Sequence, residues 1–496
     1  MTSFSRRTVL KGSVAPLLSA ALGRGQGSGA ARRPILKRVN WPSFGPVRHP
    51  TPASQEEFQS RVDRARQEML RRGLTHLAVY GDREHFANLM YLCNIDPRFE
   101  EGLLILSEGR TPLLLVGNEC WGYLGNSPLW RGKALRAERF QPLSLPNEPR
   151  NQSRLLREIL SEEGIAGKAV VGCCGWKYYS DHEDPEGRCA IDAPAYIVDT
   201  LRLLTAHDRV SNATGIFNDP DTGLRTFCSP SEIAYFEFTN TLASDGMTGM
   251  LHAIRDGALD YDVARAAGYN GEPLGCHMTV NTGDPLSFGL SSPMGSTVRR
   301  GDPLSLNICY RGSNVCRSGW VAKSAQDLPA GAGDYVEAFA GPYFAAMCEW
   351  VRLLQVGQPG AALNDAIQSR LPFDRFGISL NPGHLTHLEE WLSSPIFPGS
   401  RIRLHSGMAM QSDVIPSSPK YASSRVEDGY VIADTALQAS IKHDYPECHA
   451  RCLKRREFMR SVLGIDVPDD VLPLANMAGC IPPFFLDPNL VFALEG

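Results

Sequence analysis

Residues 301–312 read GDPLSLNICYRG, and this stretch decides how we interpret the C-terminal half of the chain. Every second residue from Leu304 to Tyr310 is apolar, whereas Ser305 and Asn307 stand between them. This alternation predicts a β-strand with one face packed on a core and one mildly polar face. Asn307 raises the functional question, because its amide offers a neutral oxygen where an acidic side chain would offer a charge.

The length and composition predict a soluble protein of two domains. With 496 residues the chain exceeds one ordinary core, and 43% hydrophobic and 21% charged residues are typical of globular proteins. The net charge is −4, so no basic surface favours nucleic acid as a partner. After residue 30 no apolar run is long enough to span a membrane.

The first 30 residues predict an export signal. Paired arginines at positions 6 and 7 precede the apolar segment 14–22, and small residues fill positions 27–30. This order is typical of a secretory signal, and the paired arginines resemble those read by the twin-arginine export machinery. A disordered basic tail is the alternative, but it would not need the apolar segment. We therefore expect a periplasmic or secreted protein whose mature chain begins near Ala31.

The 13 cysteines carry no predicted function. Their spacing contains no CxxC pair of the kind that binds zinc, and the odd number leaves at least one thiol unpaired. Folding before export permits reduced, buried cysteines even in an oxidising compartment. We assign none of them a catalytic role.

Alternating helical and strand patterns divide the chain into two units. Residues 55–225 read as an α/β unit after an extended lead-in over 31–54. A second unit begins at Ser229, where the sequence Ser-Pro-Ser-Glu predicts an N-cap with a capping box. It continues over 229–440, and residues 441–496 read as a C-terminal helix and tail. The expected helices cover 55–72, 229–252, 261–269, 333–355, 361–370 and 447–464, and the expected strands cover 75–81, 101–118 as a hairpin, 167–176, 274–282, 303–310, 407–415 and 424–432.

Four segments of the second unit occur in an informative order. They are GDPLSLN (301–307), NPGHLTHLEEW (381–391), SGMAMQSDVIP (406–416) and SSRVEDGYVI (423–432). This order resembles the creatinase, aminopeptidase P and methionine aminopeptidase superfamily, the M24-type peptidases. The resemblance implies an α/β protein, with a pita-bread catalytic domain preceded by a creatinase-type N-terminal domain.

The resemblance also implies a set of metal-ligand positions. The metallopeptidases of this superfamily bind two divalent metals through Asp, Asp, His, Glu and Glu. On this chain those positions fall at Asn307, Ser318, His384, Asp413 and Glu427. Only two carboxylates then remain, and no acidic residue between positions 302 and 327 restores a third. A dinuclear site is therefore not expected and the cofactor prediction is none, although a single Mn, Co or Zn ion held by the last three residues stays open.

Creatinase offers a metal-free precedent within the same superfamily. It resembles this chain in placing Asn at the vacated ligand position. Its catalytic His, however, precedes the Gly-Asp turn by about eleven residues, where this chain has Leu290 or Ser291. Creatine is therefore not expected as the substrate.

The candidate site residues each have a structural alternative. His384 is expected as a proton shuttle or lone metal ligand, or else it is a hydrogen-bonded core residue. Asp413 and Glu427 are expected to bind a cationic group or orient water, although Asp413 also suits a strand end and Glu427 a pair with Arg425. The remaining candidates are His387 and Glu389, in the region of the superfamily's second His-Glu pair, as catalytic residues, and Asn307 and Ser318 as substrate-binding residues.

These residues predict a hydrolase of a C–N bond, amide or amidine, in a small amino-acid-derived or peptide-like substrate. The alternative is an inactive relative that binds a ligand or partner, which the lost carboxylates favour. An Xaa-Pro aminopeptidase with a full dimetal site ranks third. The resemblance also implies a homodimer.

Overall fold

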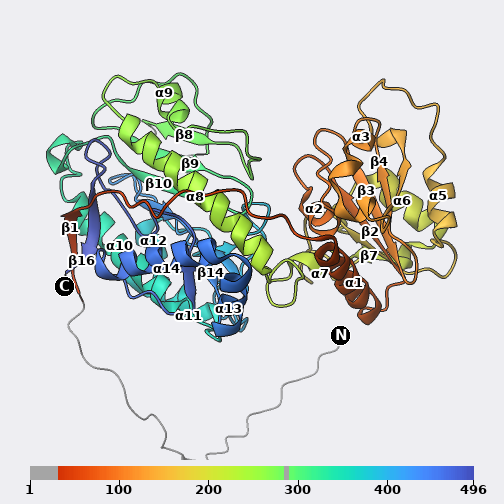
Figure 1. The fold of residues 1–496 in the computed structure, drawn as a ribbon. Coiled ribbons are helices and arrows are strands. Elements are labelled where there is room, and N and C mark those ends of the chain that lie inside the picture. Colours follow the sequence, from red (N-terminus) through yellow and green to blue (C-terminus); the bar gives the residue numbers. More distant parts are fainter. Residues whose placement is uncertain (1–31, 284–289, 496) are drawn as a thin grey trace, which may run out of the picture.

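The computed structural model describes residues 32–283 and 290–495, so the predicted export signal lies outside the described residues. Figure 1 shows two units, one built from α1–α7 with β2–β7 and one built from α8–α14 with the remaining strands. All cysteines are free thiols, and most of them are buried. Among the helices of the described residues, none has the length and apolar character to cross a membrane.

The N-terminal unit is a mixed sheet with helices on both faces. Its strand order is β5-β4-β3-β2-β6-β7, and β2 runs antiparallel to β3 and parallel to β6. Neighbouring residues of β2, such as Leu77 and Ala78, pack into separate cores because side chains alternate along a strand. The strands are β2 (His76–Gly81), β3 (Gly102–Ser107), β4 (Leu113–Val116), β5 (Arg136–Arg139), β6 (Val171–Cys174) and β7 (Val210–Asn212). The helices are α1 (Gln55–Arg71), α2 (Ala87–Cys93), α3 (Cys120–Tyr123), α4 (Pro128–Arg131), α5 (Leu156–Glu162), α6 (Ala195–Leu204) and α7 (Gly215–Asn218).

The C-terminal unit contains two four-stranded antiparallel sheets. The first has the order β13-β10-β9-β8 and the second β11-β12-β14-β15, and a short ribbon pairs β1 with β16. The strands are β1 (Pro34–Arg38), β8 (Thr279–Thr282), β9 (Pro303–Ile308), β10 (Val315–Trp320), β11 (His384–Leu385), β12 (Ala409–Gln411), β13 (Arg425–Glu427), β14 (Gly429–Ile432), β15 (Val471–Pro473) and β16 (Leu490–Leu494). The helices are α8 (Pro230–Ala253), α9 (Asp260–Arg265), α10 (Gly341–Leu353), α11 (Gly360–Arg370), α12 (Phe373–Phe376), α13 (Thr435–Asp444) and α14 (Pro446–Ser461), and a π-helical turn (Val336–Ala340) precedes α10.

The chain passes from one sheet to the other at Asp428. β13 pairs with β10 in the first sheet, whereas β14 pairs with β12 in the second. Arg317 of β10 lies 2.9 Å from the Asp428 carboxylate, and both side chains are fully buried. A buried ion pair that loses one partner is strongly destabilising, so this pair fixes the crossing point.

Two local predictions are confirmed in detail. In β9 the apolar residues Leu304, Leu306 and Ile308 lie in the core, as the alternation predicts. At the start of α8 the Ser229 hydroxyl accepts from the Glu232 amide, and the Ser229 amide donates to the Glu232 carboxylate at 2.8 Å. This is the predicted capping box.

Other elements differ from the sequence predictions. The lead-in contains β1, which pairs with β16. The segment predicted as a C-terminal tail contains β15 and β16, and both strands are largely buried. The strand expected over 424–432 is split at Asp428, and α13 and β10 had not been predicted. The pattern of apolar residues does not predict β10, because the charged residue Arg317 is fully buried in this strand.

Candidate active site

Four acidic or imidazole side chains meet between the two sheets of the C-terminal unit. His384, Glu390, Asp413 and Glu427 each offer one ligand atom, and these atoms all lie within 4.8 Å of one another. They come from β11, the loop after it, the segment that follows β12, and β13. The structure thus brings together three residues predicted from the sequence and adds Glu390.

His384 is held with one ring nitrogen turned towards the carboxylates. Its Nδ1 lies 3.1 Å from the Leu385 carbonyl, which can only accept, so Nδ1 carries the proton. Its Nε2 lies 3.1 Å from Glu390, 3.8 Å from Glu427 and 4.0 Å from Asp413. The ring stacks on Trp391 with a centroid distance of 4.2 Å. Burial lowers the pKa of His384, but Glu390 and the other carboxylates outweigh it and raise the pKa well above its usual value.

Arg425 joins the two carboxylates that β12 and β13 supply. Its Nη2 lies 3.0 Å from the Asp413 carboxylate and 2.7 Å from that of Glu427, and all three side chains are buried. Burial and the charge of Glu427 together raise the pKa of Asp413 to about 6, against the attraction of Arg425. A guanidinium shared by two carboxylates offsets part of their charge and fixes their orientation.

Two further hydrogen-bond donors contact Glu427. The Asn314 amide donates to Oε1 of Glu427 at 2.9 Å, and the Cys316 thiol donates to Oε2 at 3.0 Å. Asn307 in turn donates to the Asn314 side-chain oxygen and, at 3.2 Å, to the Cys316 sulfur. Asn307 is therefore a buried part of the network around Glu427.

Cys316, rather than Ser318, stands directly across from Asn307. The register of β9 and β10 pairs Asn307 with Cys316, and β13 pairs Cys316 with Glu427. Ser318 lies two residues further along and donates to the Ser305 hydroxyl at 2.8 Å. Ser318, which the resemblance indicated, lies eleven positions after Asn307, whereas the facing residues of this hairpin are nine positions apart.

His387 and Glu389 join a separate network. His387 lies 3.1 Å from Glu232 and accepts from Arg225, and Arg225 also pairs with Glu389. Burial and the neighbouring Arg225 lower the pKa of His387, so its ring is neutral. Arg225 further donates to Asn88 of the N-terminal unit at 2.9 Å, which places this network at the junction of the two units.

A cavity of about 500 Å³ lies at the same junction. Both units line it, with Arg61, Tyr235, Arg311 and Leu388 among the lining residues, whereas no member of the four-residue cluster lines it. Among the described residues, the cavity between the two units therefore does not reach the cluster.

The donor set of the cluster suits a divalent ion. His384 Nε2 is buried and makes no hydrogen bond with the described residues, although it lies 3.1 Å from Glu390. One imidazole nitrogen and three carboxylates are ordinary ligands for a single ion. An ion bound there would compete with Arg425 for Asp413 and Glu427.

Comparison with known proteins identifies the fold that carries this cluster. No family model matches the sequence, and no curated protein matches it. A prolidase from Pyrococcus horikoshii OT3 has a TM-score of 0.58 and 15% identity over 75% of this chain and 95% of that one. An Xaa-Pro dipeptidase from Bacillus anthracis has a TM-score of 0.57 and 15% identity over 76% and 96%. An X-Pro aminopeptidase from Thermotoga maritima MSB8 has a TM-score of 0.56 and 12% identity over 75% and 95%.

The chain has the pita-bread fold. This confirms the α/β class and, at the level of the fold, the resemblance carried by the four segments. Because one fold hosts many chemistries, the pita-bread architecture alone does not assign an activity. The side chains of the cluster must carry that argument.

Three members of the candidate site were missed by sequence reasoning. Glu390 directly follows the candidate Glu389, and the two neighbours turn to different networks. Asn314 lies in the turn after β9, and Cys316 lies in β10. Neither an amide nor a thiol matches the acidic residues that the resemblance led us to expect. Only the register of β9, β10 and β13 reveals that they face Glu427.

Proposed function

We propose that this chain is a hydrolase of a C–N bond, amide or amidine, in a small amino-acid-derived or peptide-like substrate, and that it works without a dinuclear metal centre. The observation that carries the proposal is the cluster of His384, Glu390, Asp413 and Glu427 within 4.8 Å. The pita-bread fold supports it, because the solved structures that share the fold include prolidases and an X-Pro aminopeptidase.

His384 is the proton carrier in this proposal. Its Nδ1 proton is fixed on the Leu385 carbonyl, so Nε2 is the atom that accepts and returns a proton. Glu390 at 3.1 Å stabilises the charged ring, and Trp391 holds the ring plane by stacking. Because the surrounding carboxylates raise the pKa of His384 well above its usual value, the ring holds its proton at neutral pH and is placed to deliver it as a general acid.

Asp413, Glu427 and Arg425 form the fixed charges of the site. Arg425 cannot lose its proton, so it holds both carboxylates in one geometry across the pH range of hydrolysis. The amide of Asn314 and the thiol of Cys316 also donate to Glu427 and fix its orientation. Carboxylates held in this way can bind a cationic group of the substrate or orient the attacking water.

His384, Glu390, Asp413 and Glu427 are also the residues that would hold a single divalent ion. Such an ion would supply Lewis-acid polarisation of a carbonyl and a water of lowered pKa. The proton-carrying role of His384 and the ligand role are alternatives for the same Nε2 atom, and metal analysis separates them.

The test is hydrolysis by the purified mature protein. Xaa-Pro dipeptides, simple amides and amidines are offered after chelation and after addition of Mn, Co or Zn. We expect turnover in at least one condition, at most one ion per chain, and loss of turnover in His384→Ala. His443→Ala is the matched control, because His443 is an exposed histidine on α13. No turnover under any condition would overturn the proposal.

A binding protein without catalysis is the second candidate. Arg425 already occupies both Asp413 and Glu427, and Asn307 contributes an amide in place of a carboxylate. This reading predicts saturable binding of a substrate-like ligand without turnover, and a loss of affinity in His384→Ala. A third reading, the Xaa-Pro aminopeptidase with a dimetal site, predicts two ions per chain.

Export through the twin-arginine route and dimerisation complete the proposal. The export proposal rests on the paired arginines and the apolar segment 14–22. In a bacterial host, replacing Arg6 and Arg7 by Lys is expected to retain the protein in the cytoplasm. Light scattering of the mature protein tests the homodimer.

A further inference from the structure

Residues 412–416 carry Asp413, and residues 423–428 carry Glu427. These two segments continue the antiparallel ladder of β12 and β14. At one end of this pair of segments the Ser412 amide donates to the Asp428 carbonyl at 3.1 Å. At the other end the Ser423 hydroxyl donates to the Pro416 carbonyl at 2.7 Å. Hydrogen-bonded pairs recur at every second residue of an antiparallel ladder. The next expected pair after Ser412 and Asp428 is therefore Val414 with Val426.

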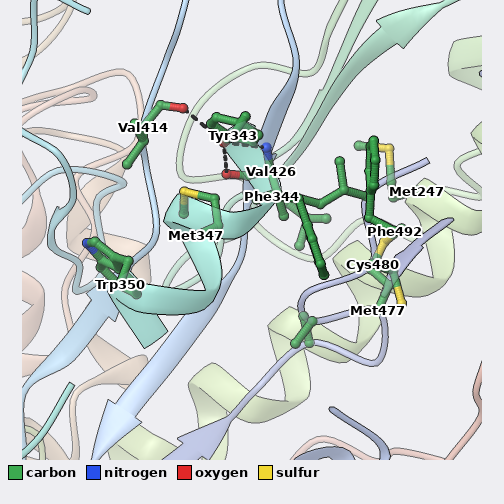
Figure 2. Packing of buried hydrophobic residues seen from close by; sticks show 14 of the residues in the cluster. Met247, Tyr343, Phe344, Met347, Trp350, Val414, Val426, Met477, Cys480 and Phe492 are labelled. Atoms are coloured by element: carbon green, nitrogen blue, oxygen red, sulfur yellow. Dashed lines mark hydrogen bonds between the residues drawn. The ribbon is translucent and has the colours of Figure 1, made fainter. Parts of the chain in front are cut away.

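The hydroxyl of Tyr343 is inserted at this expected pair. It accepts from the Val426 amide at 3.0 Å and donates to the Val414 carbonyl at 3.0 Å, with the Val426 carbonyl at 3.4 Å as a weaker alternative acceptor. Figure 2 shows these contacts running from the tyrosine to both valines. The direct amide-to-carbonyl bond of a regular ladder is thus replaced by two hydrogen bonds through one hydroxyl.

This insertion lies next to the two carboxylates. In the same register Asp413 stands opposite Glu427, one residue from each valine. Like charges directly opposite one another destabilise a ladder. A hydroxyl between donor and acceptor holds the backbones further apart than a direct bond does, and Arg425 lies between the carboxylates there.

Tyr343 is suited to a fixed spacer. It lies at the start of α10, is fully buried, and is surrounded by core residues such as Phe344 and Met347 (Figure 2). Burial raises the pKa of its phenol, so the hydroxyl stays neutral and can both accept and donate. β13 is the edge strand of its sheet, so the Val426 amide depends on this hydroxyl for its partner.

We infer that Tyr343 is a positioning residue, whose hydroxyl spaces the backbones that carry Asp413 and Glu427 and so sets the geometry of the candidate active site. Its effect on catalysis or ion binding rests on the proposed function. Its effect on the two backbones does not.

The experiment compares Tyr343→Phe with Tyr335→Phe. Tyr335 is the matched control, because it is also fully buried and its hydroxyl also donates to a backbone carbonyl, that of Ser423 at 3.1 Å. Hydrogen–deuterium exchange is measured on peptides covering 412–416 and 424–428, and Zn²⁺ affinity by calorimetry. In Tyr343→Phe we expect faster exchange in both peptides and an affinity lower by about tenfold, the scale of one lost hydrogen bond. In Tyr335→Phe we expect unchanged exchange over 412–416 and unchanged affinity.

The outcomes separate this inference from the proposed function. If the wild type neither binds Zn²⁺ nor hydrolyses any substrate, the proposed function fails, and exchange alone decides the spacing role. Equal exchange over 412–416 in the two variants overturns the inference, as does an equal loss of Zn²⁺ affinity in both. The wild type gives a further check if Tyr343→Phe does not fold, since rapid exchange of the Val426 amide would also overturn it.

Discussion

The carboxylate of Glu390 lies 3.1 Å from Nε2 of His384, whereas its sequence neighbour Glu389 pairs with Arg225 in another network. Two adjacent glutamates thus serve different parts of the molecule. We expect Glu390→Gln to lower turnover by about 10²-fold or more, in the range of a lost acid–base partner, with little loss of stability. We expect Glu389→Gln to lower the free energy of unfolding, because buried Arg225 loses its carboxylate. Steady-state kinetics and urea unfolding of both variants measure the two effects, and a reversed pattern would contradict the assignment.

Arg425 is expected to be essential for stability as well as for site geometry. Arg425→Met leaves Asp413 and Glu427 buried without their shared cation. Removal of one partner from a buried ion pair costs about 3–5 kcal/mol of unfolding free energy. Urea unfolding at neutral pH checks this figure. Arg425→Lys is the control, since it keeps the charge but cannot reach both carboxylates with one planar group, so we expect an intermediate loss.

Asp413 is expected to make stability fall as pH rises. Its pKa is about 6 in the folded protein against an ordinary 3.8, so the folded state holds the proton more tightly. The stability from this group is present below pH 3.8 and is lost as pH rises through about 6. We expect Asp413→Asn to reduce this slope when unfolding free energies of the variant and wild type are compared between these values. Asp428, whose pKa burial also raises to about 6, maintains the remainder. An unchanged slope would show that another group causes it.

The pairing of β9 with β10 predicts that further metal ligands can be introduced beside the cluster. In Asn307→Asp with Cys316→Asp, both facing positions of β9 and β10 carry a carboxylate. We expect the number of Zn²⁺ or Mn²⁺ ions bound per chain to rise above that of the wild type, measured by metal analysis after dialysis. The matched control is Asn307→Asp with Ser318→Asp, which places the second carboxylate beside Ser305 instead. If the control gains an ion equally well, the register argument is wrong.

The sequence predicted those parts of the fold that local patterns determine. Alternation found β9, and the Ser229 capping signal found the start of α8. It missed β10, because buried Arg317 is balanced by Asp428, a residue more than a hundred positions away. A partner so distant leaves no trace in a local window.

The candidate site was predicted in the same uneven way. The ordered segments located His384, Asp413 and Glu427, which the structure brings together. Glu390 was missed because a loop turns neighbouring side chains apart, which spacing does not reveal. Cys316 was missed because strand register, and not a fixed residue count, decides which residue faces Asn307.

The ribbon of β1 and β16 has a consequence for the order of folding. It joins residues 34–38 to residues 490–494, so the strand that follows the predicted leader has no partner until β16 has been synthesised. The ribosome releases every other described element first, and domains generally fold as they emerge. β1 and β16 can therefore pair only after all the other described elements have been synthesised. On the proposed export route, the strand next to the leader would therefore stay unpaired until β16 has been synthesised.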